Sequence, residues 1–227
     1  MSYLESHAQV MTTSEIYHPE IYPDVKVGDT EAAVEHLRSL MTPPNQHGLK
    51  VVVGKLQFEQ FENYGIRLEE ALDALPDCVV VVLFRRDRIA RHVSEQAATA
   101  TGDWTAKKAT GTSVAPLVDL EFDLIKAECE RSQARYSRSI SLLQELDHEH
   151  ILVSYEELRD SPDHLFDSVV WDRLGLPPSS LKTDLVKQRT VPLDEAVSDE
   201  TQLTKCLLEG WAHADFATSL DRFRFGL

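Results

Sequence analysis

The sequence lacks the features of a membrane-spanning, secreted or metal-bound protein. No apolar run approaches the roughly 20 residues that span a bilayer. The N-terminus has neither the basic start nor the apolar core of a signal peptide. Three cysteines, Cys78, Cys129 and Cys206, lie far apart without metal-ligand spacing, which fits a reducing compartment better than a disulfide framework. These absences predict a cytoplasmic protein with no metal site and no membrane span.

Positive charge is also scarce. The chain has 23 Lys and Arg against 38 Asp and Glu, a formal net charge of −15. Binding to a nucleic-acid polymer depends largely on neutralising phosphates with Lys and Arg, so we expect no nucleic-acid partner. The basic residues gather locally, between Arg85 and Arg91 and between Lys182 and Arg189. A small anionic ligand needs only such a local cluster.

The pattern of apolar residues predicts a single α/β domain over residues 1–227, without repeats or linkers. Val79–Phe84 is a continuous apolar run, typical of a strand buried on both faces in a parallel sheet. Strand-like segments alternate with helical ones, which predicts a three-layer α/β/α fold with a mainly parallel sheet. The expected strands are 49–56, 79–84 and 150–154, and the expected helices are 30–40, 66–75, 87–100 and 117–146. Residues 105–113 are expected to form a polar loop, a candidate lid.

The end of the strand at Phe84 is the strongest candidate site. Arg85 and Arg86 follow the strand, and Ser94 lies on the next predicted helix. Ligands of open α/β sheets bind at the carboxyl ends of the strands, and guanidinium groups suit a phosphate dianion. We therefore predict a nucleotide-phosphate site here, although surface arginines paired with carboxylates are the simpler alternative. Arg88 and Arg91 are predicted to be such surface arginines.

Several segments resemble one family when they are taken in order. Arg85-Arg-Asp, then Ala90-x-x-Val-Ser94, then Ala98-x-x-Thr-x-x-Trp104, resembles the 3′-phosphate-binding segment of sulfotransferases that use 3′-phosphoadenosine 5′-phosphosulfate (PAPS). The bacterial carbohydrate type, which includes trehalose, lipopolysaccharide and Nod-factor sulfotransferases, is the most similar. Further matching segments lie in the family's order along most of the chain: 14–19, 53–56, 153–158 and 185–193.

The resemblance implies a set of cofactor contacts. Arg85 and Ser94 would hold the 3′-phosphate of PAPS, and Tyr155 would lie near the adenine. Lys55 would contact the donor sulfate, or else only extend from a strand end into solvent. Two basic residues of the late segment would lie on the 3′-phosphate side, or else form a solvated patch: Lys187 and Arg189.

The resemblance also implies a catalytic carboxylate. Glu15 would take the proton of the acceptor hydroxyl as the sulfuryl group transfers, and His18 is the second candidate for this role. A surface carboxylate and a loop histidine are the simpler alternatives. The acceptor would be a carbohydrate or another small metabolite, and a homodimer is plausible for the family.

The chain departs from the family's pattern at its start. The family opens with a strand and a Gly/Ser/Thr-rich loop whose N–H groups hold the 5′-phosphosulfate. Met1–His7 aligns to the helix after that loop, and no G-x-x-x-x-G-K-[ST] motif occurs. We therefore expect the loop to be missing. The chain would then be a sulfotransferase whose activity without the loop is in question, or a non-catalytic binding or assembly protein. A different nucleotide-dependent enzyme, such as a kinase, is disfavoured by the lack of a phosphate-binding loop.

Overall fold

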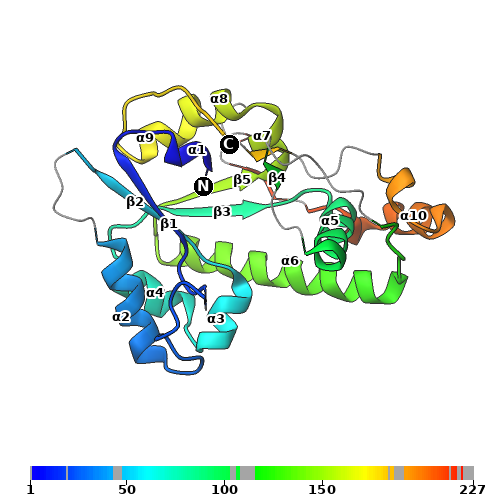
Figure 1. Cartoon of the computed structure of the whole chain (residues 1–227), viewed down its shortest axis with the longest axis horizontal. Coiled ribbons are helices and arrows are strands. Elements are labelled where there is room, and N and C mark those ends of the chain that lie inside the picture. Colours follow the sequence, from blue (N-terminus) through cyan, green and yellow to red (C-terminus); the bar gives the residue numbers. More distant parts are fainter. Residues whose placement is uncertain are drawn as a thin grey trace. The chain divides into compact units, whose positions relative to one another are not determined.

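The computed structural model describes residues 2–18, 20–42, 48–102, 106–107, 116–183, 185–186, 192–214, 216–218 and 221 (Figure 1). The chain divides into two compact units, each built from separate segments. Unit 1 comprises Met1–Val80, Glu145–Ile151 and Pro162–Thr183, and unit 2 comprises Val81–Gln144, Leu152–Ser161 and Asp184–Leu227. No helix in the described part of the chain is long and apolar enough to cross a membrane.

The strands of unit 1 form a parallel pair. β1 (Val10–Glu15) lies beside β2 (Val51–Lys55), with Val10 opposite Val51 and Glu15 opposite Lys55. The pairing is irregular between Thr12 and Glu15, because the step from Thr12 to Glu15 in β1 is three residues and the matching step from Val53 to Lys55 in β2 is two. The predicted strand at 49–56 is confirmed. The pairing brings the last residues of both strands together.

Short helices pack around this pair and form the core of unit 1. Asp29 begins the predicted helix α2, because its Oδ1 accepts a hydrogen bond from the Ala32 N–H at 3.1 Å. Tyr17, buried in the core, donates its hydroxyl to the Ala33 carbonyl at 2.7 Å. The helices before β3 are α1 (Ser2–Glu5), α2 (Thr30–Met41), α3 (Phe58–Tyr64) and α4 (Leu68–Ala74). The core residues are Ile16, Tyr17, Ala33, Leu37, Tyr64, Ile66 and Ala71.

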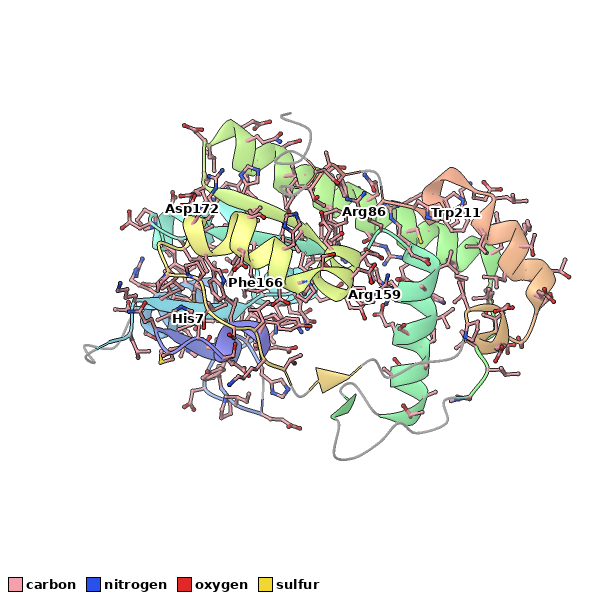
Figure 2. All side chains as sticks on the ribbon, turned by 90° about the horizontal axis from the view of Figure 1, so that it is seen from above. His7, Arg86, Arg159, Phe166, Asp172 and Trp211 are labelled. Carbon is pink, nitrogen blue, oxygen red and sulfur yellow. The ribbon has the colours of Figure 1, made fainter. Side chains whose placement is uncertain are left out.

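A continuous helical stretch completes unit 1. α8 (Pro162–Leu165) starts with proline, runs through a π-helical turn at Phe166–Val170, and ends in α9 (Trp171–Arg173). Gly175 follows with φ of 62°, a left-handed conformation that favours glycine and ends the helix. The Trp171 ring packs on His7, with ring centroids 5.0 Å apart (His7 is labelled in Figure 2).

Unit 2 contains most of the second strand pair, β3 (Val80–Phe84) with β5 (His150–Ser154). Both strands were predicted. The expectation that β3 is buried on both faces is wrong, because Val81 and Leu83 are 45% and 48% exposed. Val82 and Phe84 are buried, so burial alternates along β3 as in a sheet covered on one side. An uninterrupted apolar run does not reveal which of its two faces is covered.

Four helices and a shared core make up most of unit 2. The predicted helices at 87–100 and 117–146 are confirmed, the second starting five residues later than predicted. The helices are α5 (Arg88–Thr101), α6 (Phe122–Glu145, light green in Figure 1), α7 (Tyr155–Asp160) and α10 (Glu200–Leu207). The core residues are Ile89, Val93, Ala97, Val118, Leu120, Ile125, Cys129, Ala196, Val197, Leu203, Cys206 and Ala212. Single 3-10 turns lie at Asp194–Ala196 and Gly210–Ala212.

A third strand pair in unit 2 is antiparallel and short: β4 (Ala106–Lys107) pairs with β6 (Leu185–Val186). β4 falls inside the segment expected to be a lid loop, and the rest of that segment lies outside the described residues. Together the elements give a mixed α/β protein with two-stranded sheets in the described part of the chain.

Candidate functional site

The turn from β3 into α5 positions Arg85 and Ser94. Asp87 begins α5 by accepting a hydrogen bond from the Ala90 N–H at 2.8 Å, so Arg85 lies between the strand end and the helix cap. Its Nη1 donates to the Ser94 Oγ at 3.4 Å, and the same hydroxyl donates to the Ala90 carbonyl at 2.8 Å. A guanidinium group and a hydroxyl are thus adjacent at the carboxyl end of a strand.

The start of α7 brings the third predicted residue to this place. Tyr155 directly follows β5, where Ser154 and Glu157 cap α7 with reciprocal hydrogen bonds. The Arg85 guanidinium lies over the Tyr155 ring, 4.6 Å from its centroid. Such a cation–π contact holds a cation over an aromatic face without neutralising it. Three of the predicted cofactor residues, Arg85, Ser94 and Tyr155, therefore lie together in unit 2.

Arg85 has no carboxylate partner among the described residues. Its Nε is buried and makes no hydrogen bond within the described part of the chain. Leaving a buried N–H without an acceptor lowers stability by about 1–3 kcal/mol, and by more for a charged group. Buried N–H groups are therefore usually hydrogen-bonded to protein or to water. The described acidic residues of the chain therefore do not neutralise the Arg85 guanidinium.

Arg86, in contrast, is occupied by the protein itself (Figure 2). Its Nη2 pairs with the Asp221 Oδ2 at 2.5 Å, and its backbone N–H donates to Glu156 at 3.0 Å. Burial alone would raise the pKa of the Asp221 carboxyl, but hydrogen bonds from the Thr218 N–H and the Arg86 guanidinium outweigh it and lower that pKa. The sequence places two guanidinium groups at the predicted phosphate site, and among the described residues only one of them, Arg86, has a carboxylate partner.

The prediction that Arg88 is a surface arginine paired with a carboxylate is wrong. Arg88 is 6% exposed, and its Nη1 donates to the carbonyls of Cys129 and Trp211 at 3.2 and 3.1 Å. Burial lowers the pKa of its guanidinium from the usual value. Arg91 does pair with carboxylates, Glu95 at 3.2 Å and Glu128 at 3.4 Å. Arg88 faces the core because it starts the apolar face of α5, where Ile89 is also buried.

Sequence reasoning missed a buried histidine on the same helix. His92 is 9% exposed, and its Nδ1 lies 2.8 Å from the Glu128 Oε2 of α6. This hydrogen bond is the main cause that lowers the pKa of Glu128. Arg88 and His92 are four residues apart, about one helical turn, so they lie on the same face of α5. This spacing is the sequence signal that could have indicated that His92 lies beside Arg88. Nothing local in the sequence points to Glu128 as the partner.

The predicted catalytic residues lie in unit 1. Because β1 and β2 end opposite each other, the Lys55 Nζ reaches the Glu15 Oε1 at 2.7 Å. Gln57, which sequence reasoning missed, donates its Nε2 to the same oxygen at 2.9 Å. None of the hydrogen bonds in the described part of the chain uses the Oε2 of Glu15. His18 follows in the next turn, and its Nδ1 is buried with no hydrogen-bond partner within the described residues.

Other features of the chain add no ligand to these groups. Lys187 and Arg189 lie outside the described residues. No group of three or more His, Cys, Asp or Glu in the described part could hold a metal ion. A shallow hollow of about 470 Å³ lies along α10, and the described residues that line it include no predicted site residue. Its lining residues are Glu200, Thr201, Thr204, Lys205 and Leu208.

The comparisons with known proteins identify no relative: no family model, curated protein or solved structure matches the chain. The functional interpretation therefore depends on the side chains described above.

Proposed function

We propose that the chain is a PAPS-dependent sulfotransferase that binds the 3′-phosphate of its nucleotide at Arg85 and Ser94 and the adenine beside Tyr155. The acceptor is the hydroxyl of a carbohydrate or other small metabolite. The observation that carries the proposal is the Arg85 guanidinium, held by Ser94 and Tyr155 yet free of any carboxylate within the described residues. The proposal includes the three-layer α/β/α architecture, with which the mixed α/β elements and the parallel β1–β2 pair are compatible.

A phosphate dianion fits the donors at this site. The Arg85 guanidinium has no carboxylate partner within the described residues, and the Ser94 hydroxyl can turn from the Ala90 carbonyl toward a phosphate oxygen. Hydrogen bonds to charged groups contribute about 1.5–3 kcal/mol each, which exceeds the neutral bond that Ser94 gives up. Lys187 and Arg189 would complete the 3′-phosphate side.

In the proposed reaction the acceptor oxygen attacks sulfur, and the bond from sulfur to the 5′-phosphate oxygen breaks. The nucleotide product, 3′-phosphoadenosine 5′-phosphate (PAP), leaves with the electron pair of that bond. The acceptor proton passes to the Glu15 Oε2, or to His18 in the second assignment. Lys55 and Gln57 hold the other carboxylate oxygen of Glu15 in place.

The Glu15–Lys55 pair also favours a second candidate function, a protein that binds the nucleotide without turnover. Lys55 is the residue predicted to contact the donor sulfate, and it is bound to the predicted base at 2.7 Å. A cation that neutralises the base is less available to the sulfuryl group. In this alternative, the fold and the Arg85 site serve recognition or assembly.

Calorimetric titration with PAP tests the proposed site. We expect micromolar binding, about −8 kcal/mol, by the wild-type chain. Arg85→Ala should weaken binding at least tenfold. Arg138→Ala, which removes an exposed arginine from α6, should leave it unchanged. Equal affinities for the Arg85→Ala variant and the wild type would contradict the assignment, as would no binding by the wild type.

A turnover assay separates the two candidates. With labelled PAPS and a panel of carbohydrate acceptors, the enzyme releases PAP only when an acceptor is present. Glu15→Gln should abolish this release while PAP binding persists. PAP binding without acceptor-dependent release, in the wild type and in Glu15→Gln alike, would support the non-catalytic binding protein instead.

A further inference from the structure

The C-terminal part of unit 2 crosses the end of β3. We use the name C-terminal strap for the described residues 213–214, 216–218 and 221. The strap forms an antiparallel bridge between His213 and Asp87, and the Ala214 N–H donates to the Arg86 carbonyl at 2.9 Å. These contacts reach the two residues that follow Arg85 in the sequence.

The backbone N–H, the carbonyl and the guanidinium of Arg86 each have a protein partner. Its N–H donates to Glu156, its carbonyl accepts from Ala214, and its guanidinium pairs with Asp221. Glu156 also accepts from the Asp87 N–H at 3.3 Å, which fixes the turn that leads into α5. The backbone after Arg85 therefore has little freedom to rotate.

The last residue of β3 and the two residues after it make different contacts. Phe84 packs edge-on against Phe216 of the strap, with ring centroids 5.2 Å apart, and Arg86 pairs with Asp221. Arg85, between them, contacts Ser94 and Tyr155 instead. The strap thus contacts both sequence neighbours of Arg85.

The strap is also joined to the helix that carries Tyr155. Thr218 is fully buried, and its hydroxyl donates to the Glu157 carboxylate. Glu157 in turn accepts from Ser154, which caps α7. Thr218 and Asp221 are linked to each other, because the Thr218 N–H donates to Asp221 at 3.0 Å. One short segment therefore connects the strand end beside Arg85 with the helix start at Tyr155.

We propose that the C-terminal strap positions the Arg85 guanidinium over Tyr155, with Asp221 acting through Arg86 as a positioning residue for the anion site. This inference rests on the proposed nucleotide site for its functional meaning. The placement of the Arg85 guanidinium over Tyr155 itself needs no ligand. It assigns Asp221 a role opposite to the one that its charge alone would give. A carboxylate near an anion site repels the anion, so its removal would tighten binding if only charge mattered.

The test compares Asp221→Asn with Glu130→Gln, a matched loss of one negative charge from an exposed residue of α6. The first measurement needs no ligand: hydrogen exchange of the Arg85 Nε–H by NMR, with the signal assigned by Arg85→Lys. We expect the buried Nε–H to exchange at least tenfold faster in Asp221→Asn and unchanged in Glu130→Gln. Asp221→Glu, which keeps the carboxylate, should restore part of the protection.

The second measurement is the PAP affinity of the same variants. We expect about tenfold weaker binding for Asp221→Asn. Unchanged Arg85 exchange, or tighter PAP binding by this variant, would overturn the positioning role. Should PAP bind no variant, wild type included, while Arg85 exchange responds as expected, the proposed nucleotide function fails and the positioning role stands.

A milder variant guards against a general loss of folding. Thr218→Val removes the hydroxyl that reaches Glu157 and keeps both charges of the Arg86–Asp221 pair. The backbone amide spectrum of α5 and α6 should stay unchanged in it, while Arg85 Nε–H exchange accelerates. Slow Arg85 exchange in both folded variants, Thr218→Val and Asp221→Asn, would show that the strap does not position Arg85.

Discussion

The packing around Gly54 leaves no space for a larger side chain. A Cβ at this position would lie 2.4 Å from the Ile16 Cδ1 and 2.8 Å from the Met41 Sδ. Ile16 is 1% exposed, so it has no open space into which to move. β2 therefore needs glycine here because of close approach, with no left-handed φ involved.

Gly54→Ala should lower the free energy of unfolding by about 1–3 kcal/mol, because the added methyl forces a packed side chain to shift. Gly210→Ala is the control, since no atom lies within 4 Å of a Cβ at that position. The control should be neutral or slightly stabilising, because alanine restricts the unfolded chain. Urea unfolding measures both, and equal stabilities of the two variants would contradict the close approach.

The candidate anion site also depends on residue-scale detail. Arg85 and Arg86 are neighbours of identical chemistry, yet only Arg86 has a carboxylate, Asp221, among the described residues. Their sequence predicts a basic site but not which guanidinium is available. The contacts of the folded chain decide that, because Arg86 pairs with Asp221 while Arg85 contacts Ser94 and Tyr155.

At the scale of elements, polar side chains join α5 to α6. Arg91 and His92 of α5 both contact Glu128, and Arg88 donates to the carbonyl of Cys129. Because His92 is buried, its hydrogen bond with Glu128 is shielded from water better than a surface pair. The two helices are therefore coupled through one carboxylate.

Glu128→Gln should reveal this coupling through pH. The pKa of Glu128 is lowered in the folded chain, so its contribution is present above the unfolded pKa and is lost as pH falls through the folded one. We expect the variant to be less stable than the wild type by about 1 kcal/mol at pH 6. The difference should be smaller at pH 3 than at pH 6.

Urea unfolding at the two pH values measures this difference. Glu130→Gln, which changes the exposed neighbour two residues along α6, should show no such pH dependence. A Glu128→Gln difference of the same size at pH 6 and pH 3 would contradict the proposed charge coupling.

On the scale of the molecule, each unit is built from segments that are distant in the sequence. The core of unit 2 contains residues before Gln144 and residues after Thr183. The late contributors are Ala196, Val197, Leu203, Cys206 and Ala212. A buried aliphatic side chain contributes about 1.5–3 kcal/mol, and a domain is stable by only about 5–15 kcal/mol.

A chain that ends at Thr183 should therefore lose the folded core of unit 2. We expect amide protons of α5 and α6 to exchange freely in it. A chain that ends at Ala212 keeps every residue of this core cluster and should retain that protection. Equal protection in the two truncated chains would show that the late segment is not needed for the core.

Local sequence patterns predicted several elements and the position of the candidate site. Short-range rules suffice for the strand at 150–154 and for the helix at 87–100. They also placed Arg85 beyond a strand end, within reach of a serine on the next helix. These features involve residues within about ten positions of each other, where backbone preferences and helical spacing act directly.

Only the tertiary structure decided which groups are neutralised, buried or free. The pairing of Arg86 with Asp221 spans 135 positions, and that of His92 with Glu128 spans 36. Arg88 is buried because α6 and the turn at Trp211 supply carbonyl acceptors, which no local pattern reveals. Which face of β3 is covered also depends on packing, since Val82 and Phe84 are buried while Val81 and Leu83 are exposed. Contacts between distant segments depend on how the elements pack, so the availability of Arg85 is a property of the folded chain.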